Sequence, residues 1–126
     1  MAWRDWGTVP INSTTPQPAS NPSTSTLIAE VDSTQLGTRN FATGQSRPAL
    51  VTWILGSDTN ATWQCEVANS TALASPIDAI YLRTPAGASG QFVTTHNIPK
   101  DGRVRARLDS TFTGGATAFI AVEYMT

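Results

Sequence analysis

The residues that could carry out chemistry are few, and the sequence does not group them. Cys65 is the only cysteine and His96 is the only histidine. A histidine-activated nucleophile, or a metal site with several His or Cys ligands, needs partners that are not placed beside either residue. The phosphate-binding loop, the dinucleotide-binding glycine motif and the nucleophile-elbow motif do not occur. We therefore expect no catalytic residues, no metal and no cofactor.

The sequence around these two residues favours structural roles. In the stretch ATWQCEV, residues 61–67, apolar and polar side chains alternate, which is typical of a strand with one buried face. Trp63 and Cys65 fall on the apolar side, so we expect Cys65 to be a small hydrophobic core residue. His96 lies in TTHNIPKDG, where a predicted strand ends before a turn. We expect it in a surface loop.

Two other kinds of site remain open as alternatives. The nine acidic residues are scattered, but two of them could still face each other in a cleft, as in a glycosidase. Exposed aromatic side chains could stack on sugar rings in a carbohydrate-binding module, and Trp53, Tyr81 and Tyr124 are the candidates. All three lie within apolar strand patterns, where burial in a core or interface is the more common outcome.

Three arginines alternate with apolar residues in RVRARLD, residues 103–109. Arg103, Arg105 and Arg107 are expected on the outward side of a strand. Such a row can be a solvated face that discourages aggregation, or a cationic stripe that pairs with carboxylates of a neighbouring subunit or another protein. Seven of the eight basic residues are arginine, whose planar guanidinium suits protein contacts. This bias favours a subunit or capsid contact.

The composition limits the fold and the partners. The chain has 126 residues, enough for one domain, and only 13% of them are charged, with a net charge of -1. We expect no binding to nucleic acid or to a membrane, because the overall field is weak and no stretch has the length of a membrane span. The first residues lack the features of a secretory signal, so we expect synthesis in a cytoplasm.

Strand patterns separated by Gly, Pro, Asn and Asp fill the chain from residue 26 onward. The eight candidate strands are 26–32, 38–43, 49–56, 61–69, 77–83, 90–95, 103–109 and 116–124. Regular spacing without a helical pattern predicts an all-β fold, an eight-stranded antiparallel sandwich or jelly roll, for residues 26–126.

Residues 1–25 form a different region, rich in Pro, Ser and Thr and without hydrophobic periodicity. We expect an extended N-terminal arm. Its apolar anchors are Trp3, Trp6, Val9 and Ile11, and burying two tryptophans could hold a handful of arm residues in place. The arm could fold back on its own domain or dock on a capsid or neighbouring subunit.

Two predicted strands are apolar on both of their faces, and the second of them is the terminal strand ATAFIAVEY, residues 116–124. In LVTWIL, residues 50–55, Leu50 and Ile54 lie opposite Val51, Trp53 and Leu55. Both faces of such a strand must be covered. The N-terminal arm, a loop or another subunit could cover Leu50 and Ile54. We favour another subunit, and therefore a homo-oligomer.

The arrangement of an arm "MAWRDWGTVPINSTTPQPASNPS" before a charge-poor β-domain ending "NIPKDGRVRARLDSTFTGGATAFIAVEYMT" resembles small bacteriophage virion proteins of the head decoration or capsid-associated type. The turn IPKDG, the arginine strand and the small-residue last strand are similar to the closing strands of viral jelly rolls. The resemblance covers most of the chain and includes no diagnostic motif.

The resemblance implies a non-enzymatic protein of the virion, made in the host cytoplasm, that binds and reinforces the capsid surface. Its partners would be the major capsid protein or other virion proteins, and its oligomer a trimer. The anchors of the arm would contact the lattice or a neighbour, and the three arginines a subunit or the capsid. The alternative is a carbohydrate- or host-receptor-binding module at a fibre or spike tip.

Overall fold

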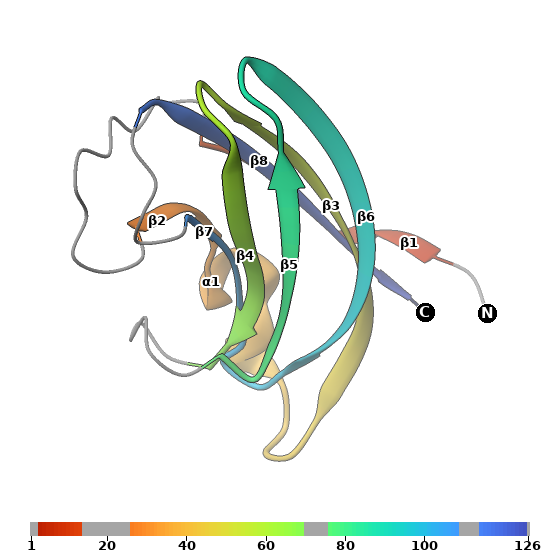
Figure 1. The fold of residues 1–126 in the computed structure, drawn as a ribbon. Coiled ribbons are helices and arrows are strands. Elements are labelled where there is room, and N and C mark those ends of the chain that lie inside the picture. Colours follow the sequence, from red (N-terminus) through yellow and green to blue (C-terminus); the bar gives the residue numbers. More distant parts are fainter. Residues whose placement is uncertain (1–2, 14–25, 70–75, 109–113, 126) are drawn as a thin grey trace.

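The computed structural model describes residues 3–13, 26–69, 76–108 and 114–125, and places them in two facing β-sheets (Figure 1). The elements in chain order are β1 (Trp3–Ser13), β2 (Thr26–Val31), α1 (Ser33–Leu36), η1 (Thr38–Asn40), β3 (Ser46–Ser57), β4 (Ala61–Ala68), β5 (Asp78–Thr84), β6 (Ala88–Pro99), β7 (Arg103–Leu108) and β8 (Ala116–Met125).

The strand order is that of a jelly roll. Sheet A has the order β1-β8-β3-β6 and sheet B the order β2-β7-β4-β5. The first strand pairs with the eighth, the second with the seventh, the third with the sixth and the fourth with the fifth, all antiparallel. The chain is thus one long hairpin rolled into two sheets. The predicted all-β, eight-stranded fold is confirmed.

The core lies between the sheets and follows the alternation of the strands. Trp53 of sheet A and Trp63 of sheet B are both completely buried, and so is Cys65, as the sequence predicts. The last strand, β8, turns Ile120 and Val122 inward. These residues form one contiguous hydrophobic cluster, which is the arrangement expected for a single sandwich.

A short helical segment replaces one predicted strand. Residues 38–43 were expected to be extended, but η1 (Thr38–Asn40) follows α1 there. Asp32 caps α1 in a capping box with Gln35, and Gly37 ends it with a φ of 73°. The Thr38 hydroxyl donates to the Gly102 carbonyl oxygen at 2.8 Å and so ties this turn to the chain before β7. The local caps and this long-range hydrogen bond together outweigh the extended preference of the segment.

The structure still has eight strands, because residues of the predicted N-terminal arm form one of them. Residues 3–13 form β1, an edge strand of sheet A that pairs with β8 and has an interrupted register. The segment is extended, and its backbone takes the first of the two expected alternatives, folding back on its own domain. The side chains of Trp3, Trp6, Val9 and Ile11 lie outside the described part of the structure, as do residues 14–25.

Within the described residues, neither helical segment has the length and apolar character needed to cross a bilayer.

Candidate functional site

The three arginines of β7 lie on the outer face of sheet B, as their alternation predicts, because the residues between them point into the core. Their exposure decides between the two alternatives in part. Arg105 has an exposed fraction of 0% and Arg107 of 6%, and the side chain of Arg103 is 15% exposed. The alternative of a solvated face is therefore wrong for Arg105 and Arg107.

Carboxylates on the two neighbouring strands explain how these charges can be buried. Glu30 of β2 and Glu66 of β4 both lie opposite Arg105 of β7 in the sheet register. Arg105 Nε is 2.9 Å from Glu30 Oε2, and Arg105 Nη1 is 3.7 Å from Glu66 Oε1. Arg103 Nη1 donates to Glu30 Oε1 at 3.0 Å, and Arg107 Nη2 donates to Glu66 Oε2 at 3.1 Å. Opposite charges alternate across the sheet, as buried charges require.

This ion-pair ladder, formed by Glu30, Glu66, Arg103, Arg105 and Arg107, occupies the arginines within their own chain. A carboxylate of another subunit would have to compete with Glu66, which is itself fully buried. The proposed subunit or capsid contact of the arginines stays a prediction, and it is best placed at the partly exposed Arg103. The sequence contained both carboxylates, but it could not show that β2, β7 and β4 are neighbours.

His96 takes part in a second polar network, at the edge of the sandwich. It lies within β6, not in a surface loop, and its side chain is 1% exposed. Its Nδ1 is 2.6 Å from Asp78 Oδ2, and its Nε2 is 2.8 Å from Thr94 Oγ1. The Thr94 oxygen in turn accepts a 2.8 Å hydrogen bond from Trp53 Nε1. The expectation of a surface loop is wrong, because the strand continues three residues past His96 and turns its imidazole inward.

Hydroxyl, imidazole and carboxylate in this order are also the parts of a catalytic triad. In a triad the hydroxyl faces a substrate cleft that provides oxyanion-binding donors. Here Thr94 accepts the indole N–H of a core tryptophan, and neither of the two surface hollows described for this chain is lined by Thr94, His96 or Asp78. The arrangement fits the satisfaction of buried polar groups, and it links β5 of one sheet to β6 of the other.

Of the three aromatic residues considered as sugar platforms, two are in the core. Trp53 is fully buried and Tyr124 is 1% exposed, with its hydroxyl donating to the Leu36 carbonyl oxygen at 3.1 Å. Tyr81 is 67% exposed on β5, on the same outer face as the ladder. Tyr81 is therefore the candidate that keeps a free ring face.

The outer face of sheet A carries an apolar strip. We name it the outer apolar strip and define it as Leu50, Ile54, Val93 and Phe119. Ile54 of β3 is 40% exposed and Val93 of β6 is 54% exposed, while Leu50 and Phe119 are partly buried. Phe119 lies directly opposite Ile54. The predicted second apolar face of β3 is confirmed, and at Ile54 it is uncovered within the described residues.

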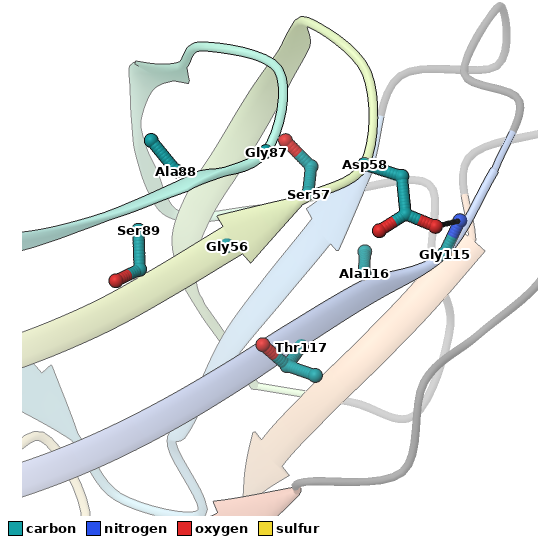
Figure 2. Close-up of a pocket in the computed structure, with 9 residues that line it drawn as sticks. All are labelled: Gly56, Ser57, Asp58, Gly87, Ala88, Ser89, Gly115, Ala116 and Thr117. Atoms are coloured by element: carbon teal, nitrogen blue, oxygen red, sulfur yellow. Dashed lines mark hydrogen bonds between the residues drawn. The ribbon is translucent and has the colours of Figure 1, made fainter.

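A surface hollow of about 420 Å³ adjoins the end of this strip (Figure 2). It exists because Gly56 has no side chain between Ser89 of β6 and Thr117 of β8, which lie opposite it in the register. Figure 2 shows Asp58 at its rim, where Oδ2 accepts a 3.1 Å hydrogen bond from the Gly115 amide. The lining has one carboxylate and no aromatic ring, so it supplies neither a carboxylate pair nor a stacking platform.

Cys65 has the environment of an inert thiol. It is fully buried between the sheets, and this burial, together with the neighbouring Glu66 charge, raises its pKa to about 12. Among the described residues, no group of three or more His, Cys, Asp or Glu side chains could hold a metal ion. Nucleophilic or metal chemistry therefore has no assembled site in this part of the chain.

Comparison with known proteins gives structural likeness only. No protein-family model matches the chain, and no curated protein sequence matches it. Among solved structures, the tobacco streak virus coat protein is similar at 7% identity and a TM-score of 0.46, covering 97% of this chain and 88% of that one. The dimer of that coat protein gives 6% identity and a TM-score of 0.40, with 96% and 88% covered. A CBM4 structure gives 12% identity and a TM-score of 0.48, with 93% and 90% covered. These likenesses concern the fold and assign no function to this chain.

Proposed function

We propose that this chain is a non-enzymatic structural protein of a bacteriophage virion, which binds and reinforces the capsid surface as a decoration or auxiliary protein. Jelly rolls serve as capsid domains and as lectins, so the fold admits this role without selecting it. The organisation that resembles small virion proteins supports the proposal. The observation that carries it is the outer apolar strip, because an uncovered apolar face on a sheet marks a protein contact.

Two further features of the described surface support attachment as the role. The arginines and glutamates of sheet B are engaged with one another, and the hollow beside Gly56 lacks paired carboxylates. A decoration protein needs only modest affinity at each site, because many identical contacts act together on a lattice. Its partners would be the major capsid protein or other virion proteins.

The proposal also gives the apolar residues of the N-terminal segment a contact role. Trp3, Trp6, Val9 and Ile11 belong to β1, which forms the edge of sheet A. We propose that they contact the capsid or a neighbouring copy. Deleting the segment would remove a strand from the sheet, so single substitutions Trp3→Ala and Trp6→Ala are the appropriate test.

Attachment is tested on gradient-purified virions of the phage that encodes this chain. We expect the protein at a fixed copy number per particle, and we expect particles stripped of it to release DNA at a lower temperature. Rebinding of the purified protein should restore the release temperature. Ile54→Lys should prevent rebinding, whereas Thr43→Lys, in the exposed turn before β3, should not. Absence of the protein from purified particles would overturn the proposal.

A carbohydrate- or host-receptor-binding module at a fibre or spike tip is the second candidate. It is favoured by Tyr81, whose exposed ring stands on the outer face of β5 between the partly buried Ala79 and the exposed Arg83. A ring of this kind can stack on a sugar. Glycan-array binding that Tyr81→Ala abolishes and Tyr81→Phe preserves would select this function over capsid attachment.

A further inference from the structure

Among the strands that the structure describes, four lie at the edges of the jelly roll, β1 and β6 in sheet A and β2 and β5 in sheet B. An edge strand presents unpaired N–H and C=O groups, which can pair with a strand of another chain. Proteins protect such edges with charged side chains, proline, bulges or short strands. The four edges of this sandwich differ in how far they are protected.

Three of the edges carry these features. β1 contains Arg4 and Pro10, and its register with β8 is interrupted. β2 is six residues long and contains Glu30, and its register with β7 is also interrupted. β5 is seven residues long and has Asp78 at its start and Arg83 near its end. Each of these strands is a poor template for a further strand.

β6 has none of these features before its last residue. It has twelve residues, contains no Asp, Glu, Lys or Arg, and has its proline at its last position. Its register with β3 runs without a bulge from the Ser46–Pro99 pair to the Ser57–Ala88 pair. Within the described part of the chain, β3 is the only strand paired with it. Figure 1 shows β6 as a long ribbon at the rim of sheet A. This edge is long, regular and uncharged.

The side chains of β6 suit a strand partner as well. Gln91, Val93 and Thr95 are exposed on the outer face, and two of the three are β-branched. Val93 lies opposite Thr52, which is two residues before the exposed Ile54 of β3 and on the same face. A strand added to β6 would therefore extend the outer apolar strip sideways.

We propose that β6 is a strand-addition site and that its occupant is β6 of a second copy of this chain, in antiparallel orientation. An uncharged strand meets its own copy without repulsion, and a two-fold axis at Val93 places Gln91 of one copy opposite Thr95 of the other. Outer faces then lie side by side, since these residues share one face. The two outer apolar strips join, and the two sheets A form one continuous sheet.

This contact forms a two-fold dimer, where the resemblance to decoration proteins favoured a trimer. It concerns the free protein and does not depend on the virion assignment. Light scattering of the full chain should give twice the monomer mass of 13.4 kDa. Val93→Lys brings two like charges together at the axis and should weaken self-association at least about tenfold. Thr43→Lys adds the same charge on the exposed turn before β3 and should leave the dimer unchanged. Circular dichroism should show both variants folded.

Cross-linking distinguishes strand pairing from a looser contact. The only native cysteine is buried, so Val93→Cys introduces the one accessible thiol, and two copies of it meet across the axis. We expect a disulfide-linked dimer on mild oxidation, and none from Tyr81→Cys on the charged edge β5. A monomer in solution, an oligomer that Val93→Lys leaves intact, or a dimer in which Val93→Cys does not cross-link would each overturn the proposal.

Discussion

Arg105 of β7 lies directly opposite Glu66 of β4, and neither side chain is exposed to solvent. Each also faces a further partner, Glu30 for Arg105 and Arg107 for Glu66. The charges therefore compensate one another in a row across the outer face of sheet B. Removing Glu66 from this row leaves Arg107 buried without the carboxylate that it contacts and leaves Arg105 with Glu30 alone, which costs far more than the intact row contributes.

Replacing Glu66 should therefore destabilise the protein strongly. Glu66→Gln leaves the guanidinium groups of Arg105 and Arg107 without their shared carboxylate, and we expect the free energy of unfolding to fall by roughly 3 kcal/mol or more. Urea denaturation measures the change. Glu123→Gln is the matched control, because that partly exposed carboxylate on β8 should change stability by less than about 0.5 kcal/mol. Equal effects of the two substitutions would contradict the ladder.

The Thr94 hydroxyl should stabilise the edge that joins β5 to β6. It accepts from Trp53 Nε1 and contacts His96 Nε2, so Thr94→Val removes the partner of two polar atoms without changing the shape of the side chain. We expect a loss of about 1–3 kcal/mol in a thermal or urea melt. Thr95→Val, on the exposed side of the same strand, should be nearly neutral. A neutral Thr94→Val would mean that water replaces the hydroxyl.

The Tyr124 hydroxyl connects sheet A to the helical turn. It donates to the carbonyl oxygen of Leu36, the last residue of α1. Tyr124→Phe leaves this carbonyl without that donor, and we expect a loss of about 1–2 kcal/mol, together with faster amide exchange in α1. Tyr81→Phe removes an exposed hydroxyl and should change neither quantity. Unchanged exchange in α1 would show that the bond does not hold the turn.

Alkaline pH should weaken the fold through Cys65. Burial raises the pKa of its thiol from 9.0 to about 12, so the folded chain keeps a proton that the unfolded chain releases. The folded state therefore keeps its full stability below pH 9, and the free energy of unfolding falls as the pH rises from 9 toward 12. Urea midpoints across this range should fall less steeply for Cys65→Ala than for the unaltered chain. In native protein at pH 8 the thiol should resist a disulfide reagent, and it should react once urea is added. Rapid reaction of the native protein would contradict its burial.

A strand could be predicted from the sequence where apolar and polar side chains alternate and turn residues follow. ATWQCEV and the terminal strand are examples. The prediction failed at residues 38–43, where the capping pair Asp32 and Gln35 starts a helical turn. That signal was present in the sequence as Asp-x-x-Gln. β1 was not predicted as a strand, because Gly7 and Pro10 are unfavourable within strands. Its pairing with β8 also depends on residues far away in the chain, which the local sequence does not indicate.

The positions and burial of the candidate site residues were predictable only in part. The outward position of Ile54 follows from the period of two, and its side chain is 40% exposed; the expected cover by another subunit stays a prediction. The burial of Arg105 was not predictable, because it depends on Glu30 and Glu66 reaching the same place from strands far apart in the chain. The burial of His96 was not predicted for a related reason. Its hydrogen-bond partner, Asp78, lies on a strand of the other sheet. Strand order decides these environments, and one sequence does not reveal it.

The place of β8 between β1 and β3 governs the order in which this protein can be assembled on the ribosome. β8 is synthesised after both of its neighbours, so sheet A stays split while the chain is being made. Folding must wait for this central strand to emerge, and closing pairs so distant in the chain takes roughly milliseconds to seconds.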